Sequence, residues 1–388
     1  MKLAALWPFA VLLPVLVLVL GPVRAARAEG PWEVTPESEQ ALKRGLAWLD
    51  RNQGREGNWT SNDLGLVSMG ALAFLAAGEM PGRGPHGEAL QRTLDYVLTQ
   101  AQKKKSGLLN VSDAQRDMYN HGLSTFVLGQ AYGMTSDPRI GATLDRALRL
   151  IAQTQCRDGG WDYRAERQDQ GHDLSLAVMQ AKALRSAVDS GLEVPPEVIE
   201  AAIVDVRRHY GPQGCSYEAD EAEQQKHPGQ FGYSKGGGQT TVAMAAAGVV
   251  CLQEFAQYDD WRIPKNLEVI EKAIRDFGDP KTKRDRPPLD AYTLYYVGQA
   301  LYQIGGKPWE RLYPPLRDSI VNSQVRQARP ENNINNDGMW IDERRVSGKP
   351  GQLYMTSVCC FILAMPNRYL PILQEGKIDS LRQQFRKK

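Results

Sequence analysis

The sequence is poor in the residues from which metal and haem centres are built. Its 388 residues include five cysteines and five histidines, and no Cys-x-x-Cys pattern occurs. The histidines form no pair at ligand spacing, so each is expected to cap a helix, pack or lie on the surface. They are His86, His121, His172, His209 and His227. The sequence therefore predicts no metal site and no cofactor.

A strong positive charge is also lacking. The formal net charge is +2, and it becomes −1 if residues 1–28 are removed, since they carry Lys2, Arg24 and Arg27. A nearly neutral chain lacks the basic surface that nucleic acid requires, which excludes a nucleic-acid partner. The basic residues 381–388 are typical of a solvated end rather than of a binding patch.

Long hydrophobic runs are absent except at the start of the chain. An apolar stretch from Leu3 to Leu20 is followed by "VRAARA", whose small residues permit cleavage after Ala28. This arrangement predicts a signal peptide over residues 1–28 and an exported protein, either periplasmic or secreted. A retained membrane anchor is the alternative, but Pro8 and Pro14 interrupt the run. No later stretch is apolar enough to cross a membrane.

A short pattern recurs along the rest of the chain. In each copy a Gln is followed by a Gly and then by a Trp. The clear copies are Gln53, Gly57 and Trp59; Gln155, Gly159 and Trp161; and Gln324, Gly338 and Trp340. Weaker copies lie around Gln102 and Gly107 and around Gly214 and Tyr217. Such repetition indicates that residues 29–388 form one domain built from repeats.

Each copy separates two kinds of helical pattern. The segment before it is amphipathic, as in "ALKRGLAWLDRN", where Leu42, Leu46 and Leu49 share one face. The segment after it, such as "LGLVSMGALAFLAAG", contains no Asp, Glu, Lys or Arg. A helix that is apolar all round is buried on every side.

Charged helices that alternate with uncharged helices predict two concentric rings. The outer and inner helices pair as 36–52 with 63–78, 85–103 with 119–133, 137–155 with 173–190, 195–210 with 239–256, 265–277 with 289–304, and 308–325 with 352–365. The predicted fold class is all-α, an (α/α)6 toroid of six helical hairpins with QxxxGxW-type junctions.

The three residue types of the pattern suit a junction between hairpins. A Gln amide can donate to and accept from unpaired backbone groups at helix ends. Gly supplies the positive φ with which the chain leaves a helix, and Trp covers the junction with a flat apolar surface. We therefore expect a structural role for these residues rather than contact with a ligand.

The cysteines divide into two groups. Cys251, Cys359 and Cys360 lie in apolar helical runs, where they are expected to act as small buried hydrophobic residues. Cys156 and Cys215 follow the Gln or Gly of consecutive repeats, on loops at one end of the predicted toroid. These two are the predicted disulfide, and the odd count leaves at least one thiol without a partner in the chain.

The "QxxxGGW" and "QxxxGxW" elements resemble the repeats of the prenyltransferase and squalene-oxidase repeat family. That superfamily includes class II terpene cyclases, the β subunits of protein prenyltransferases and complement-type thioester domains. Segments such as "MYNHGLSTFVLGQAYG", "QCRDGGWDY" and "DLSLAVMQAKALRSA" are similar to secreted bacterial members whose activity is generally unassigned. The resemblance covers nearly all of residues 29–388 and implies the toroid fold, but not one function.

The residues that carry the family's chemistry are missing. Class II cyclases protonate an alkene with an Asp-x-Asp-Asp motif at the start of an inner helix, and the corresponding place is "DLSL", where Ser175 and Leu176 replace two of the acids. Serine cannot supply that proton, so Asp173 is expected to be a helix N-cap. Prenyltransferases need Asp, Cys and His on zinc, but Asp290 has no Cys nearby and no His follows His227. The thioester string Cys-Gly-Glu-Gln is absent.

The mouth of the toroid is the remaining place for a site. All the inner helices are expected to begin at the same end, where their dipoles favour an anion or polar oxygen atoms. Besides Asp173 and His172, the candidate residues there are Asp63, Tyr119, His121, Gln239, Thr240, Asp290, Tyr292 and Tyr354.

The leading hypothesis is an exported binding or interaction protein, with an unidentified apolar ligand or a protein partner, on a cyclase-like toroid without the family's catalytic residues. The alternative is an enzyme that acts on an isoprenoid or other apolar substrate through an acid such as Asp173 with His172. A glycan-processing toroid would need paired carboxylates facing the cavity, and the sequence shows no such pair. A closed aromatic chamber around a buried Asp173 would favour the enzyme, and a filled centre would favour the binding protein.

Overall fold

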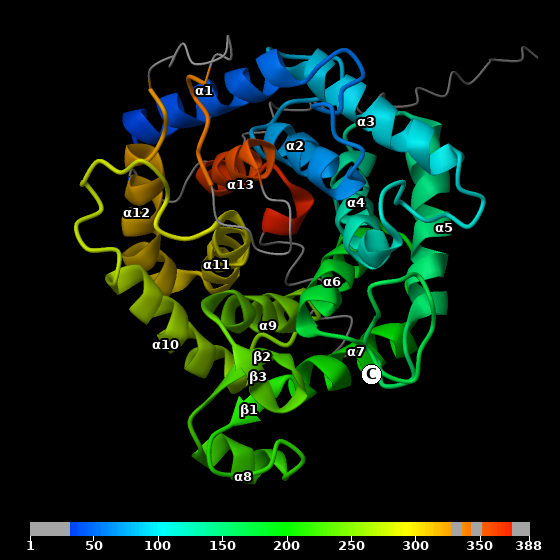
Figure 1. Cartoon of the computed structure of the whole chain (residues 1–388), viewed down its shortest axis with the longest axis vertical. Coiled ribbons are helices and arrows are strands. Elements are labelled where there is room, and N and C mark those ends of the chain that lie inside the picture. The colour runs from blue at the N-terminus through cyan, green and yellow to red at the C-terminus, as the bar shows by residue number, and fades with distance from the viewer. Residues whose placement is uncertain (1–31, 327–335, 343–350, 375–388) are drawn as a thin grey trace, which may run out of the picture.

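The helices of the chain form two concentric rings (Figure 1). The computed structural model describes residues 32–326, 336–342 and 351–374. The predicted signal peptide and the basic residues 381–388 lie outside these ranges.

Within the described residues, six helices form the outer ring and six form the inner ring. The outer helices are α1 (Pro36–Asn52), α3 (Gly87–Gln102), α5 (Pro138–Thr154), α7 (Pro196–Arg208), α10 (Arg262–Arg275) and α12 (Gly306–Asn322). The inner helices are α2 (Leu64–Ala76), α4 (Asp117–Tyr132), α6 (Leu174–Asp189), α9 (Val242–Glu254), α11 (Ala291–Ile304) and α13 (Gln352–Ala364). Contacts of α13 with α2 and of α12 with α1 close the two rings. The predicted (α/α)6 toroid is confirmed.

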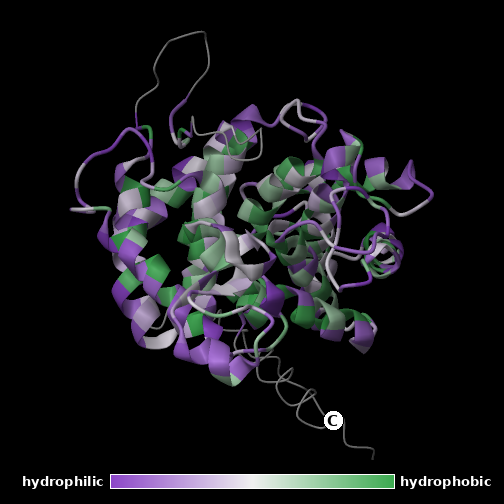
Figure 2. Cartoon of the chain, turned by 60° about the horizontal axis from the view of Figure 1, so that its bottom comes forward, coloured by the Kyte–Doolittle hydropathy of each residue, from purple (hydrophilic) through white to green (hydrophobic). Residues whose placement is uncertain are grey.

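The two rings are buried to different degrees. In α1 the buried residues include Ala41, Leu42 and Leu49, which lie on one face, whereas α2 is buried along nearly its whole length. Hydrophobic residues accordingly gather on the inner helices and hydrophilic residues on the outer surfaces (Figure 2). No helix among the described residues is both long and apolar enough to cross a membrane.

Hydrogen bonds tie each clear copy of the repeat to the next outer helix. The Nε2 of Gln53, Gln155 and Gln324 donates to backbone oxygens of α3, α7 and α1, at 2.6, 2.9 and 2.8 Å. The indole N–H of Trp59, Trp161 and Trp340 donates to backbone oxygens of the preceding outer helix, at 2.8, 2.9 and 2.7 Å. These contacts lock neighbouring hairpins together around the ring.

The glycines of the repeat allow close contact with the next hairpin. Gly57, Gly159 and Gly338 have φ of +82°, +98° and +96°. A Cβ atom on Gly159 would lie 2.1 Å from the carbonyl oxygen of Ala201 in α7. A side chain at that position would therefore push the next outer helix away.

The fourth junction differs from the prediction. The chain between α7 and α9 forms a small antiparallel sheet of β1 (Tyr210–Pro212), β2 (Gly229–Ser234) and β3 (Gly238–Thr240), with the short helix α8 (Glu221–Lys226) between β1 and β2. Phe231, rather than the predicted Tyr217, packs on an inner helix here, since a Cβ on Gly248 of α9 would lie 2.3 Å from its ring. Its backbone N–H donates to Asn266 of α10.

Glycines make this sheet possible. Gly211 of β1 and Gly232 of β2 approach the backbone of the Gly236–Gly238 run so closely that a Cβ on either would lie within 2.4 Å of a carbonyl oxygen. The inner helix predicted from residue 239 consequently begins at Val242. Short 3-10 turns occupy Ala114–Arg116, Lys235–Gly237, Met365–Asn367 and Pro371–Leu373.

The predicted disulfide between Cys156 and Cys215 is wrong. All five cysteines are free thiols. Cys156 is buried at the end of α5, where its N–H donates to the oxygen of Gly160. Cys215 belongs instead to the segment between β1 and β2, which projects from the ring with α8 (Figure 1). The prediction placed both cysteines on equivalent repeat loops, and the insertion removes that equivalence. Cys251, Cys359 and Cys360 are buried as expected.

Candidate functional site

The N-terminal ends of the inner helices surround a cavity of about 410 Å³. Inner helices α2, α4, α6, α11 and α13 all contribute to its wall, together with the 3-10 turn η1 (Ala114–Arg116) and the loop after Trp161. The lining residues are Asp63, Gly65, Leu66, Asp113, Gln115, Arg116, Tyr119, Asn120, Leu123, Tyr163, Met179, Tyr292 and Tyr354. We call this the first cavity.

A second cavity of about 370 Å³ adjoins the first. The two share Tyr119, Tyr163 and Tyr292. The second cavity is completed by His172, Asp173, Ser175, Tyr233, Ser234 and Gln239. The β2–β3 hairpin therefore forms one of its walls, and tyrosines separate the two spaces.

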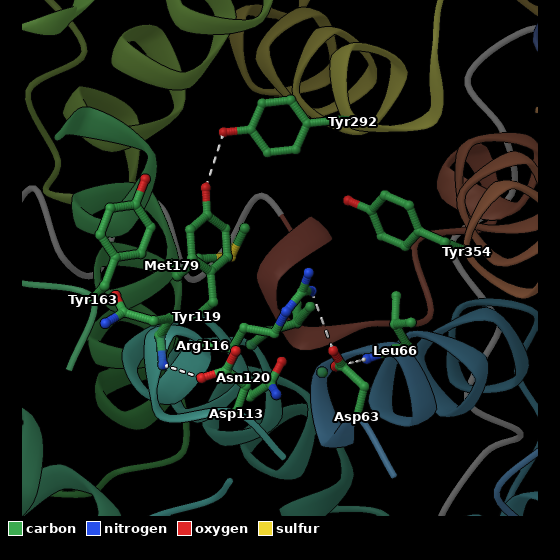
Figure 3. Close-up of a pocket in the computed structure, with 13 residues that line it drawn as sticks. Asp63, Leu66, Asp113, Arg116, Tyr119, Asn120, Tyr163, Met179, Tyr292 and Tyr354 are labelled. Atoms are coloured by element: carbon green, nitrogen blue, oxygen red, sulfur yellow. Dashed lines mark hydrogen bonds and ion pairs between the residues drawn. The ribbon is translucent and has the colours of Figure 1, made fainter. Parts of the chain in front are cut away.

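Tyrosine hydroxyls point into the first cavity. Tyr119 of α4 and Tyr292 of α11 meet across the ring, with their hydroxyl oxygens 3.3 Å apart (Figure 3). The Tyr354 hydroxyl points toward the same space from α13 and has no hydrogen-bond partner among the described residues. Burial raises the pKa of all three phenols above the usual range. They are therefore neutral at any physiological pH and can donate hydrogen bonds.

Every carboxylate that lines the two cavities begins a helix. Asp63 accepts from the N–H of Leu66 in α2, at 3.1 Å, and Asp113 accepts from that of Gln115 in η1, at 3.0 Å. Asp63 also lies 3.4 Å from the guanidinium of Arg116, which extends into the cavity (Figure 3). Both acids therefore act as N-caps, with their oxygens bound to hydrogen-bond donors.

Asp173 has the same role in the second cavity. It is the N-cap of α6 and accepts from the N–H of Ser175 at 3.0 Å. Its other oxygen accepts from the hydroxyl of Tyr163 at 2.6 Å and lies 3.2 Å from His172 Nδ1. The hydroxyl of Ser175 also donates to Asp173, to the oxygen that accepts from the Ser175 N–H. Asp173 is buried, but the His172 side chain is 56% exposed, so the pair does not sit in a closed chamber.

The structure brings together most of the predicted mouth residues. Asp63, Tyr119, Tyr292 and Tyr354 line the first cavity, and His172, Asp173 and Gln239 line the second.

Three of the predicted mouth residues line neither cavity. His121 is buried on the opposite side of α4 from Tyr119, facing α5, where its Nε2 lies 3.0 Å from the Ala147 oxygen. Thr240 belongs to β3, not to a helix, and is exposed. Asp290 caps α11 by accepting from the backbone and hydroxyl of Thr293.

Several lining residues were not predicted. Tyr163 follows the Trp161 junction by two positions, and Arg116 belongs to the linker before α4. Both residues lie in linkers that pass over the mouth to reach the next inner helix. Attention to these linkers in the sequence would have identified them. Tyr233 was missed because the β2–β3 hairpin was not foreseen. No group of three or more His, Cys, Asp or Glu within the described ranges could hold a metal ion.

The centre of the ring, below the cavities, contains buried charges that were not predicted. Lys182 of α6 lies 3.4 Å from Glu254 of α9 and hydrogen-bonds Gln299 of α11. Its ammonium also lies 4.6 Å from the ring centre of Phe126 in α4 and 5.4 Å from that of Tyr295 in α11. Both charged side chains are at most 1% exposed. Side chains from four inner helices therefore fill the centre.

Known structures share the fold. No protein-family model matches the sequence, and no curated protein matches it. An inactive variant of an α-1,6-mannanase of Salegentibacter, in complex with α-1,6-mannotriose, superposes with a TM-score of 0.53 and 10% identity, over 88% of this chain and 100% of that one. The type II terpene cyclase MstE from Scytonema gives 0.51 and 13%, over 87% and 100%. A D-mannose isomerase gives 0.53 and 10%, over 86% and 98%. Identities this low show the α/α toroid fold and nothing finer.

Proposed function

We propose that this chain is an exported binding protein that holds a small ligand at the mouth of its toroid without converting it. The proposal rests on the hydrogen bonds of the acids. Each carboxylate that lines the two cavities accepts a backbone hydrogen bond at the start of a helix. An acid catalyst must instead be free to donate a proton to its substrate.

The filled centre supports the same proposal. Enzymes that enclose a reactive intermediate need a chamber that excludes water. Here Lys182, Glu254 and Tyr295 occupy the middle of the ring, and the cavities lie above them at the helix ends. The volume of the first cavity, about 410 Å³, falls within the range of small-molecule sites.

The alternative is an enzyme, as the mannanase, the cyclase and the isomerase with the same fold are. In this alternative Asp173 would act as the acid on an isoprenoid or other apolar substrate. Its oxygens instead accept hydrogen bonds from Tyr163 and Ser175, which is the arrangement of a helix N-cap. In the mannanase the inactive variant replaces two adjacent aspartates. In the present sequence adjacent aspartates occur at Asp259 and Asp260, which precede the outer helix α10 and line neither cavity.

The test combines binding with turnover. The purified chain is incubated with D-mannose, α-1,6-mannotriose, choline, citrate, geraniol and squalene, and both Tm and product formation are measured. Leu66→Trp fills the first cavity, and Val204→Trp adds the same ring to an exposed site on the outer helix α7. We expect at least one compound to raise the Tm of the wild type and of Val204→Trp but not of Leu66→Trp, with no product formed.

Two results would contradict the proposal. One is conversion of any compound to product, most directly if Asp173→Asn abolishes that conversion while the Tm stays high. The other is the absence of any Tm shift that depends on Leu66, which would show that the first cavity binds none of these classes.

A further inference from the structure

We propose that the ligand of the first cavity is a neutral polyhydroxylated molecule, a sugar. This inference rests on the proposed binding function and specifies its ligand. The polar groups around the cavity, their charges and the orientation of its tyrosines lead to it in three steps.

The cavity contains a hydroxyl donor that has no acceptor among the described residues. Tyr354 is 8% exposed, its hydroxyl points into the cavity, and it has no hydrogen-bond partner among the described residues (Figure 3). The hydroxyl is free to donate a hydrogen bond to a ligand oxygen placed beside it in the cavity. The raised pKa of Tyr354 keeps this hydroxyl a donor.

The same wall also offers acceptors. Asp63 is 6% exposed and uses one oxygen for the Leu66 N–H and the other for Arg116. Each carboxylate oxygen has two lone pairs, so both can accept a further hydrogen bond from the ligand. Asp113 adds a second carboxylate to the wall. A ligand rich in hydroxyls, each of which both donates and accepts, can satisfy Tyr354 and Asp63 together.

Charge and ring orientation exclude the other classes of ligand. Two carboxylates against one guanidinium oppose an anion. A quaternary ammonium ion needs the faces of aromatic rings, whereas Tyr119, Tyr292 and Tyr354 direct their hydroxyls inward (Figure 3). A hydrocarbon such as an isoprenoid would leave the polar groups unsatisfied. The apolar patch of Leu66, Leu123 and Met179 suits the C–H face of a sugar ring.

Isothermal titration calorimetry with the purified chain tests the inference. The probes are D-mannose and D-glucose, with choline, citrate and geraniol as the competing classes. We expect a sugar to bind and Tyr354→Phe to weaken it about three- to tenfold, the effect of one lost hydrogen bond. Tyr96→Phe removes a hydroxyl that bonds Ser61 outside the cavity, and it should leave the affinity unchanged. Equal Tm values for the two variants would verify folding.

The outcomes separate this inference from the proposed function. If choline, citrate or geraniol binds in a manner that Leu66→Trp abolishes while the sugars do not, the ligand class is wrong and the binding function stands. Sugar binding that Tyr354→Phe leaves intact also overturns the inference. If nothing binds in a manner sensitive to Leu66→Trp, both proposals fail.

Discussion

Burial keeps the imidazole of His121 neutral, and two hydrogen bonds determine which ring nitrogen carries the proton. Its Nδ1 accepts from the backbone N–H of Leu109 at 3.1 Å, so its Nε2 carries the proton and donates to the oxygen of Ala147 at 3.0 Å. A proton on Nδ1 would face the N–H of Leu109 and break the first bond. Burial lowers the pKa of His121 from 6.5 to about 4, and the bond to Ala147 opposes the shift only in part.

This histidine should make the protein sensitive to mild acid. Between pH 6.5 and pH 4 the unfolded chain binds a proton at His121 that the folded chain does not, so the free energy of unfolding falls as pH falls through this window. The full shift corresponds to a loss on the order of 3 kcal/mol. Urea unfolding at pH 7 and pH 4.5 should show a smaller acid loss for His121→Gln than for the wild type.

The control for this measurement is His227→Gln. His227 lies closer to the surface than His121 and pairs with Glu223. Its replacement should leave the acid loss close to that of the wild type. An equal loss in all three proteins would show that other groups account for the acid sensitivity.

Single residues were predictable where their role is local. The N-cap role of Asp173 follows from its position before an apolar helix, and the structure bears it out. The partner Tyr163 was not predicted, because its contact depends on how the preceding loop folds back. For His121 the helix was predicted but the direction of the side chain was not. It lies two residues after Tyr119, roughly 200° further around α4, and so faces away from the cavity.

Two glycines with positive φ allow the backbone strain and the steric clash of an added side chain to be measured separately. Gly159 has φ of +98° and also approaches the backbone of Ala201, whereas Gly191 has φ of +75° and no atom within 4 Å of the position that a Cβ would take. Gly191→Ala should cost only the backbone strain, about 1–2 kcal/mol. Gly159→Ala adds a steric clash of about 1–3 kcal/mol and should be the less stable variant.

Denaturant unfolding of the two glycine variants provides the measurement. The difference between them estimates what close packing of hairpin on hairpin contributes to stability. If both lose the same amount, the contact between the loop and α7 tolerates a methyl group and backbone strain alone explains the need for glycine.

Helices were predictable from the sequence to within a few residues, and the sheet was not. Alternation between amphipathic and uncharged segments defines both rings, because each hairpin must present one face to solvent and bury the other. The sheet between α7 and α9 has strands of three to six residues, and it depends on close approach of Gly211 and Gly232 to the Gly236–Gly238 run. Short strands rich in glycine carry no hydrophobic period by which they could be recognised.

Two charged side chains meet at the centre of the ring. Mostly uncharged inner helices predict an apolar centre, yet Lys182 and Glu254 lie there, within 3.4 Å of each other. Glu254 falls at the end of an otherwise uncharged helix, and Lys182 lies in the middle of α6. Both charges can be read from the sequence of the inner helices. The sequence could not show that α6 and α9 bring Lys182 and Glu254 into contact.

Removal of one partner of this pair should be far more costly than removal of both. Lys182→Met leaves the Glu254 carboxylate buried with Gln303 but without the ammonium that contacts it, which is expected to cost about 3–5 kcal/mol. The double variant Lys182→Met with Glu254→Gln removes both charges and should recover most of that loss, because the desolvation of two ions is avoided. The measurement is the free energy of unfolding of the wild type, the single variant and the double variant.

Arg149 and Asp145 supply the matched surface pair, since they lie 2.8 Å apart on α5 with side chains 70% and 55% exposed. Arg149→Met should cost at most about 0.5 kcal/mol.

Neither Lys182 nor Glu254 lines either of the two cavities, so the double variant should also bind any ligand of the first cavity as the wild type does. A Lys182→Met variant no less stable than Arg149→Met would mean that water reaches the centre of the ring. A double variant that is stable but unable to bind would mean that the central pair sets the shape of the mouth, so that the filled centre is part of the site.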